Sequence, residues 1–177
     1  MEDENELLDL IDENDKVIGT VRRTEYYKEP VKPKGYLRSV ELFIRNNKGQ
    51  LWIPRRTAQK KVAPNGLDYS CGGHVTSGED YVTALVREIK EELNMGISPN
   101  DLHFIKKFHP STGYPWFRCL YLYESNEVPK YNREDFSEYY WLTPQQLLTK
   151  LKSGEPAKVS MLSAVREVLD VLSSQRL

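Results

Sequence analysis

The sequence predicts an α/β protein in which a β-sheet is covered by helices and preceded by an N-terminal β-hairpin. Three observations predict this class. Short segments rich in Val, Ile, Leu and aromatic residues alternate with turn residues, as strands do. Apolar residues recur at helical spacing after a glycine pair at 72–73, and again near the C-terminus. The length of 177 residues, without internal repeats or a low-complexity linker, favours one domain spanning residues 1–177.

The first part of the chain predicts two hairpins and a further strand. In residues 7–23 the segments LLDLI and KVIGTVRR flank the turn-rich tetrad DEND. Residues 24–35 are polar, contain two prolines and predict a loop. A strand over 37–46 then turns through Asn-Lys-Gly into a strand over 50–55. A further strand over 67–71 leads to the glycine pair.

The last part of the chain predicts strands followed by two helices. Thr143 is the expected N-cap of the first of these, with a proline at its first position. The second has apolar residues at helical spacing and is expected to cover a face of the sheet. The predicted strands span 102–109, 117–123 and 137–142, and the helices span 144–152 and 159–172.

A longer helix is predicted directly after the glycine pair. Thr76 or Ser77 is the expected N-cap, which puts the acidic Glu79 and Asp80 in the first turn. An apolar stripe defines the face that meets the sheet. It consists of Val82, Leu85, Val86, Ile89 and Leu93.

Three carboxylates gather on another face of this helix. Glu88, Glu91 and Glu92 stand at positions i, i+3 and i+4, about 125° from the centre of the apolar stripe. A solvated acidic face is one interpretation. The other is a site for a hard cation such as Mg²⁺ or Mn²⁺, which carboxylate oxygens bind readily. The pair Gly72-Gly73 lets the backbone approach a metal or phosphate closely, which favours the cation site.

The stretch from residue 73 to residue 95 resembles the Nudix box, G-x5-E-x7-R-E-U-x-E-E-x-G-U, where U is a bulky apolar residue. One position departs from the pattern, because Asn94 stands where the family has glycine, and asparagine is the next best left-handed helix cap. The pattern is filled by Gly73, Glu79, Arg87, Glu88, Ile89, Glu91, Glu92 and Met95.

The resemblance implies the Nudix fold, a mixed β-sheet sandwiched between helices, and hydrolysis of diphosphate linkages with Mg²⁺ or Mn²⁺ as cofactor. Glu88, Glu91 and Glu92 would be metal ligands or water activators, and the Gly73 carbonyl would be a further ligand. Arg87 and Glu79 would brace the loop by an ion pair. In many family members another loop supplies an extra glutamate, for which Glu124, Glu127 and Glu134 are candidates.

The segment before the glycine pair resembles the isopentenyl-diphosphate isomerase branch of the family. Arg-Arg-x-x-x-Lys-Lys-x-x-Pro spans residues 55–64. In that branch the second arginine and the first lysine bind the diphosphate, which corresponds to Arg56 and Lys60. The alternative interpretation is that these cations are solvated loop surface.

The isomerase chemistry itself does not carry over. Gly72 occupies the position of the catalytic cysteine, and Cys71, one residue early, is expected to be a small buried side chain. His74 matches a metal-binding histidine, but residues 24–41 contain no histidine and residues 116–124 contain no Glu-x-Glu. We therefore expect a hydrolase on an isomerase-like scaffold. His74 is expected to contact substrate, or alternatively to bond to the backbone at the strand end.

The expected reaction is hydrolysis of a phosphoanhydride in a nucleoside diphosphate-X compound or another organic diphosphate. One alternative is isopentenyl-diphosphate isomerisation, and a second is a non-catalytic Nudix domain that binds a ligand. Tyr114 and Trp116 could stack on a base, or could belong to the core. The substrate partner is a small molecule in each case.

Composition excludes several other partners. The net charge is −1, with 25 basic and 26 acidic residues, which gives no electrostatic case for a nucleic-acid polymer or a membrane surface. Two cysteines make no disulfide framework. The N-terminus MEDENELLDL does not resemble a signal peptide, so we expect a cytoplasmic protein. The hairpin could pack on its own domain or on a second copy, which leaves a homodimer open.

Overall fold

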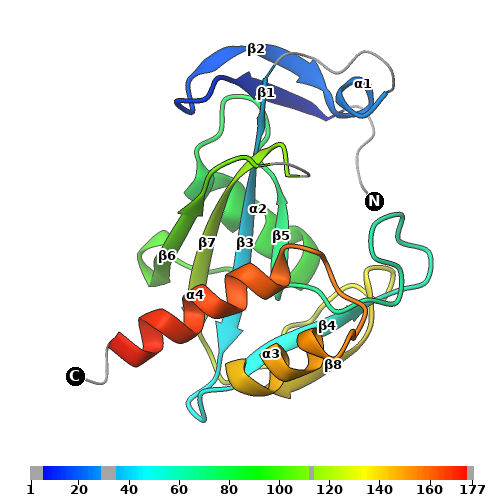
Figure 1. Cartoon of the computed structure of the whole chain (residues 1–177), viewed down its shortest axis with the longest axis vertical. Coiled ribbons are helices and arrows are strands. Elements are labelled where there is room, and N and C mark those ends of the chain that lie inside the picture. Colours follow the sequence, from blue (N-terminus) through cyan, green and yellow to red (C-terminus); the bar gives the residue numbers. More distant parts are fainter. Residues whose placement is uncertain (1–5, 29–34, 112–113, 175–177) are drawn as a thin grey trace.

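The computed structural model describes residues 6–28, 35–111 and 114–174. Its main sheet has six strands and is mixed, with helices on both faces (Figure 1). The strand order is β6-β7-β3-β4-β8, and β5 pairs with β3 beside this path. The pair β3–β7 is parallel and the other pairs are antiparallel. The predicted fold, with its N-terminal hairpin, is confirmed.

The elements begin and end as follows. The hairpin strands are β1 (Leu7–Ile11) and β2 (Val17–Arg22), followed by the short helix α1 (Arg23–Tyr26). The strands of the main sheet are β3 (Leu37–Arg45), β4 (Leu51–Arg56), β5 (Cys71–His74), β6 (Leu102–Phe108), β7 (Trp116–Glu124) and β8 (Phe136–Leu142). The remaining helices are α2 (Tyr81–Leu93), the 3₁₀ helix η1 (Pro99–Asp101), α3 (Pro144–Lys152) and α4 (Met161–Ser174).

The two faces of β3 separate the core into two halves, because successive side chains of a strand point to opposite faces. Val40, Leu42 and Ile44 pack under α2. Phe43 packs on the opposite face with residues of α3 and α4. In Figure 1, α4 crosses in front of the sheet while α2 lies behind it.

A split between β3 and β4 creates the place for the glycine loop. These strands share only the pair Arg45–Leu51 before they diverge, and β5 pairs with β3 beyond that point. Ser70 lies buried in the split, where its hydroxyl donates to the Trp52 carbonyl at 2.6 Å and accepts from the Ile44 amide at 2.8 Å. The split therefore sets β5 against the start of α2.

Three predicted elements differ from the structure. The strand predicted over 67–71 is found at Cys71–His74, because Leu67 instead lies between the diverging strands and makes only isolated bridges to Arg55 and Ala157. The predicted loop over 24–35 contains part of α1, and its residues 29–34 lie outside the described structure. The last helix begins at Met161 instead of residue 159.

The N-cap of α2 is Asp80, so the prediction of Thr76 or Ser77 was wrong. The Asp80 carboxylate accepts from the Thr83 amide at 2.7 Å, and neither Glu79 nor Asp80 lies in the first turn. Thr76 instead forms a hydrogen bond within the loop, where its amide donates to the Glu79 carboxylate at 3.1 Å. In the part of the chain that is described, no helix is long and apolar enough to cross a membrane.

Candidate active site

Helix α2 carries the three carboxylates beside its buried face. Leu85 and Ile89 are buried against the sheet. Glu88 and Glu92 are partly buried at the side of the helix, while Glu91 is exposed. The helical spacing had predicted an intermediate position for all three carboxylates, which is confirmed for Glu88 and Glu92, whereas Glu91 is exposed.

Gly73 provides the space that the Glu88 carboxylate occupies. A β-carbon added at residue 73 would lie 2.1 Å from Glu88 Oε1 and 2.2 Å from its carboxyl carbon. No side chain fits at that distance, so only glycine allows the carboxylate to lie directly on β5. At the next turn of α2, Glu92 Oε2 accepts from the Gly72 amide at 3.3 Å.

Arg87 ties the loop before α2 to the helix. Its Nε and Nη2 each lie 3.0 Å from an oxygen of the Glu79 carboxylate, which confirms the predicted brace. Nη2 also donates to the His74 carbonyl at 3.1 Å and to the Thr76 hydroxyl at 3.2 Å. The guanidinium thereby fixes the end of β5, the loop and the helix relative to one another.

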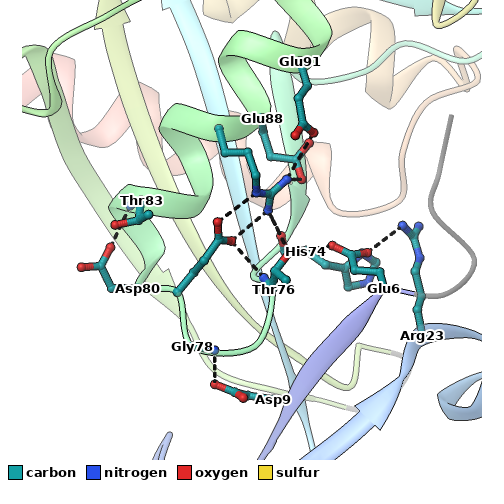
Figure 2. Close-up of polar contacts among 12 residues, drawn as sticks. Glu6, Asp9, Arg23, His74, Thr76, Gly78, Asp80, Thr83, Glu88 and Glu91 are labelled. Carbon is teal, nitrogen blue, oxygen red and sulfur yellow. Dashed lines mark hydrogen bonds and ion pairs between the residues drawn. The ribbon is translucent and has the colours of Figure 1, made fainter.

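The same guanidinium reaches two of the site carboxylates. Arg87 Nη1 lies 2.9 Å from Glu88 Oε1 and 3.3 Å from Glu91 Oε2. Figure 2 shows the Glu88 and Glu91 carboxylates turned toward the same point. Arg87 therefore neutralises part of the negative charge on this face of α2.

Burial raises the pKa of both inner carboxyls. For Glu88 the rise is opposed by Arg87 and reinforced by the neighbouring charges of Glu91 and Glu6. For Glu92, burial and the adjacent Glu88 charge raise the pKa to about 7. Each of these partly buried carboxyls has its charge disfavoured by burial and by a neighbouring carboxylate, an unfavourable concentration of negative charge that a cation would relieve.

The donor set suits a hard divalent cation in chemistry and charge. It offers carboxylate oxygens, which Mg²⁺ and Mn²⁺ prefer, beside a backbone that Gly73 leaves accessible. Within the described ranges, no group of three or more His, Cys, Asp or Glu side chains is arranged to hold an ion. Glu91 and Glu88 turn to Arg87 and Glu92 turns to Gly72, so binding would require these carboxylates to rotate.

The N-terminal hairpin packs on the loop before α2. The Ser77 amide donates to the Leu7 carbonyl at 2.8 Å, and the Ser77 hydroxyl donates to the Asp9 carboxylate at 2.7 Å. The Thr76 hydroxyl donates to Glu6 Oε1 at 3.0 Å, and the other Glu6 oxygen lies 3.2 Å from Arg23 Nη1 (Figure 2). Sequence reasoning missed these residues, since nothing in the sequence places the hairpin over the loop.

His74 lies at the end of β5 among aromatic side chains. Its Nε2 lies 3.0 Å from the Tyr27 hydroxyl, which also accepts from Trp116 Nε1 at 3.1 Å. Burial, together with the charges of Arg23 and Lys158, lowers the pKa of His74 to about 3. A neutral imidazole therefore follows Gly73 in the chain, and its side chain bonds to a phenol, not to backbone. Tyr114 makes an edge contact with Trp116.

The two cations proposed from the isomerase-like motif are both held in ion pairs. Arg56 is 5% exposed, pairs with Asp68 and donates to the Val62 carbonyl at 2.7 Å. Lys60 pairs with Asp135 in the loop before β8. The interpretation as solvated loop surface is wrong for Arg56, which is buried.

Three other candidates have been placed. Cys71 is buried, as expected, and burial raises the pKa of its thiol further from the physiological range. Glu124 lies 3.7 Å from Arg45, and Glu134 contributes its backbone carbonyl to the Thr57 hydroxyl. Neither contact involves α2.

Lys158 pairs with a buried carboxylate in the segment before β5, a contact that sequence reasoning missed. It lies in the connection between α3 and α4, 66 positions after Glu92, and belongs to no motif. Its ammonium lies 3.0 Å from Asp68 Oδ1, so one buried carboxylate pairs with both Lys158 and Arg56. Only the folded chain brings this lysine to the segment before β5.

The fold and this helix define a hydrolase of the Nudix class, and comparison with known proteins agrees. The model of the NUDIX domain matches residues 35–165. The chain therefore belongs to the Nudix family and is a pyrophosphohydrolase of that family. The hairpin and α1 precede the matched residues.

Two bacterial members of the family align with this chain over most of the length of both proteins. The chain is 42% identical over 163 residues to a Nudix hydrolase of Deinococcus radiodurans, which covers 92% of this chain and 93% of the relative. It is 41% identical over 165 residues to the uncharacterized Nudix hydrolase all7351 of Nostoc sp., with 91% and 94% covered. These relatives give no support to an isomerase-like branch.

Solved structures agree with the fold. The crystal structure of DR0079 from Deinococcus radiodurans matches with a TM-score of 0.80 at 40% identity, over 91% of this chain and 98% of that chain. A MutT protein from Methanosarcina mazei matches with a TM-score of 0.60 at 22% identity, over 79% of this chain and 98% of that chain, a likeness of fold alone.

Proposed function

We propose that the protein hydrolyses a phosphoanhydride bond in a nucleoside diphosphate-X compound or another organic diphosphate, with Mg²⁺ or Mn²⁺ as cofactor. The observation that carries this proposal is the contact of the Glu88 carboxylate with Gly73, beside the partly buried Glu92. Excess negative charge at a place where only glycine fits suits an ion and its phosphate ligand.

Four residues would hold the cation: Glu88, Glu91 and Glu92 by their carboxylates, and Gly73 by its carbonyl. A bound divalent ion polarises a phosphoryl oxygen and lowers the pKa of a water molecule. The contacts of Arg87 with Glu79 and the His74 carbonyl would hold the loop in place when the carboxylates bind a cation.

Glu92 and Glu88 are the candidate bases. Burial raises the pKa of both carboxyls, that of Glu92 to about 7, and a carboxyl with a raised pKa is the stronger base. It would take the proton of the attacking water as the new P–O bond forms and the bond to the bridging oxygen breaks. His74, neutral at this pH, is proposed to contact the substrate as an uncharged side chain.

Arg56 and Lys60 are proposed to contribute positive charge to the diphosphate. Both lie in the segment that follows β4, and each is paired with a carboxylate in the protein. Arg56 would act from within its pair with Asp68, since it is 5% exposed. The isomerase-like motif around these residues adds prenyl diphosphates to the compounds worth testing.

The test is a substrate screen with Mg²⁺, scored by release of phosphate or a monophosphate. Nucleoside diphosphate sugars, dinucleotides, nucleoside triphosphates and prenyl diphosphates would be compared. We expect Glu91→Gln plus Glu92→Gln to lower turnover of the best substrate at least about 100-fold, as for loss of a general base. Lys90→Gln, an exposed change on the same helix, is the matched control.

Three results would overturn the proposal. Turnover within a few-fold of wild type in the double variant would show that the carboxylates of Glu91 and Glu92 are not needed for the reaction. Conversion of isopentenyl diphosphate to dimethylallyl diphosphate without phosphate release would establish isomerisation instead. A tight metal-dependent ligand with no product from any compound would establish a binding domain.

A further inference from the structure

We propose that Glu6, directly before β1, and Asp9, within β1, are positioning residues for the cation site of α2. They hold the loop of residues 75–80 and, through it, the Arg87 guanidinium that the site carboxylates contact. This inference rests on the proposed function, which supplies the cation. Both residues precede residues 35–165, which match the NUDIX domain, so they lie outside the Nudix box.

Asp9 holds the turn of this loop with both oxygens of its carboxylate. Its Oδ1 accepts from the Ser77 hydroxyl at 2.7 Å. Its Oδ2 accepts from the Gly78 amide at 3.4 Å, a contact that Figure 2 shows. Asp9 is 7% exposed, and hydrogen bonds that are shielded from water are electrostatically stronger than exposed ones. The loop is therefore fastened to β1 at the residues that precede Glu79.

The backbone of β1 supports the same loop. The Ser77 amide donates to the Leu7 carbonyl at 2.8 Å, and Leu8 and Thr76 form an isolated antiparallel bridge. These backbone contacts place the start of the hairpin against the loop, so the side chains of this segment reach it directly.

Glu6 connects the hairpin to the site carboxylates through the loop. The Thr76 hydroxyl donates to Glu6 Oε1 at 3.0 Å and accepts from Arg87 Nη2 at 3.2 Å. A hydroxyl has a single proton, so its bond to Glu6 directs a lone pair toward Arg87. Arg87 Nη1 lies 2.9 Å from Glu88 Oε1 and 3.3 Å from Glu91 Oε2. A continuous series of contacts thus leads from Glu6 to two of the proposed cation ligands.

This support matters because a cation on α2 would compete with Arg87 Nη1 for the carboxylates. The guanidinium would then depend on its Nε and Nη2 bonds, whose acceptors are Glu79, the His74 carbonyl and the Thr76 hydroxyl. A loop that the hairpin holds keeps these acceptors in place. The positive charge of Arg87 would therefore stay beside the loop and would not displace the cation.

Mn²⁺ binding measured by electron paramagnetic resonance tests the inference. Glu6→Ala plus Asp9→Ala removes both side-chain contacts with the loop. We expect its Kd for Mn²⁺ to rise at least about tenfold, as for the loss of residues that orient metal ligands. Glu6→Gln plus Asp9→Asn keeps oxygen acceptors for the Thr76 and Ser77 hydroxyls, so it should restore most of the Mn²⁺ affinity.

Asp15 provides the matched control, because it fastens the hairpin to the domain at another place. Among the residues that the structure describes, its ion pairs and side-chain hydrogen bonds go to Arg38, Lys107 and Tyr81, and not to the loop. Asp15→Ala should therefore lower the Tm and leave the Kd for Mn²⁺ unchanged. A Kd that rises in both alanine variants in proportion to the lost Tm would show a general effect on stability and would overturn the inference.

Thermal unfolding verifies that each variant is folded. If the double alanine variant is not, Thr76→Val replaces it, since this change breaks the connection between Glu6 and Arg87 within the loop and should also weaken Mn²⁺ binding. Thr76→Ser, which restores the hydroxyl, should bind Mn²⁺ as wild type does.

Three further results would count against the inference. Wild-type Mn²⁺ affinity in the folded double alanine variant, or in Thr76→Val where it replaces that variant, would overturn the inference and leave the proposed hydrolysis standing. An equal loss in the Glu6→Gln plus Asp9→Asn variant would assign the effect to charge instead of hydrogen bonding, and would also overturn it. Wild-type protein that binds no Mn²⁺ would contradict both proposals, whereas the expected Mn²⁺ affinities without turnover of any diphosphate would contradict only the hydrolysis.

Discussion

At the scale of single residues, Gly73 decides where the carboxylates of α2 can lie. The space above its backbone is filled by the Glu88 carboxylate, and Arg87 holds that carboxylate from the other side. The position of the Glu88 carboxylate thus depends on the lack of a side chain at Gly73 and on the guanidinium of Arg87. Both were recognisable in the sequence through the spacing of the Nudix box.

Gly73→Ala tests this dependence. Its methyl group would lie 2.1 Å from Glu88 Oε1 and must displace the carboxylate, so we expect turnover to fall about 100-fold, as for a catalytic group moved by about 1 Å. Gly96→Ala, where an added β-carbon meets nothing within 4 Å, should retain wild-type turnover. Full activity in Gly73→Ala would show that the position of Glu88 is irrelevant.

Asp15, in the turn of the hairpin, provides a test of pH dependence. Burial alone would raise its pKa, but hydrogen bonds from Lys107, Arg38 and Tyr81 lower it below the ordinary value of 3.8. A group with a lowered folded-state pKa stabilises the protein above its unfolded value and loses that contribution as the pH falls through the folded value. The contribution is therefore present at neutral pH and is lost below about pH 4.

We expect Asp15→Asn to lower the Tm at pH 7 relative to wild type. The difference between the two proteins should shrink as the pH is lowered from 4 toward 3, because wild-type Asp15 becomes protonated. Thermal unfolding followed by circular dichroism across this range makes the measurement. A constant difference at all pH values would mean that the Asp15 charge does not stabilise the hairpin contact.

At the scale of elements, the C-terminal end of α2 anchors the loop before β8. Asn94 adopts the left-handed conformation with φ 54°, as its place in the motif predicted. Its amide also donates to the Lys130 carbonyl at 2.7 Å and to Asn132 Oδ1 at 3.0 Å. Asn132 in turn donates to the Glu91 carbonyl at 2.8 Å. The asparagine, in place of the family's glycine, therefore ties the loop before β8 to α2.

Two variants separate the backbone and side-chain roles of Asn94. Asn94→Gly keeps the left-handed conformation but loses both hydrogen bonds, so we expect near wild-type Tm with faster hydrogen exchange in residues 125–135. Asn94→Ala loses the bonds and adds about 1–2 kcal/mol of backbone strain, so its Tm should be lower. Unchanged exchange in both variants would show that the loop is held by other contacts.

Local signals in the sequence were sufficient for some elements and insufficient for others. Helix α3 was predicted at residues 144–152 because its cap, proline and last turn lie within the segment itself, and Thr143 forms the capping box with Gln146. The start of α2 was misplaced because Thr76 is used by Glu79 and by the hairpin instead. Strand β5 was misplaced because its partner, β3, is more than 25 residues away.

At the scale of the whole molecule, the site joins parts of the chain that are distant in sequence. The hairpin packs on the loop before α2, and the connection before α4 packs on the segment before β5. Figure 1 shows the hairpin at one end of the sheet and the start of α4 in front of β5. The Nudix box predicted the carboxylates of α2. It did not predict the contacts of Glu6, Asp68 or Lys158, because a local sequence pattern does not show which distant residues meet in the fold.

The same arrangement predicts the effect of removing the metal ion. Because α2 is packed on the sheet by an apolar core, we expect EDTA to abolish turnover while the circular dichroism spectrum is retained. Adding Mg²⁺ should restore turnover and raise the Tm, since an ion that binds only the folded state stabilises it. Turnover that persists in EDTA would contradict a metal-dependent reaction.

In the proposed function, the carboxylates of α2 bind one divalent cation beside Gly73. Mn²⁺ binding measured by electron paramagnetic resonance tests it without reference to any substrate. Wild type should bind Mn²⁺ and give it up to excess Mg²⁺, whereas Glu91→Gln plus Glu92→Gln should weaken Mn²⁺ binding at least about tenfold and Lys90→Gln should leave it unchanged. Equal Mn²⁺ affinity in wild type and the double variant would contradict the account.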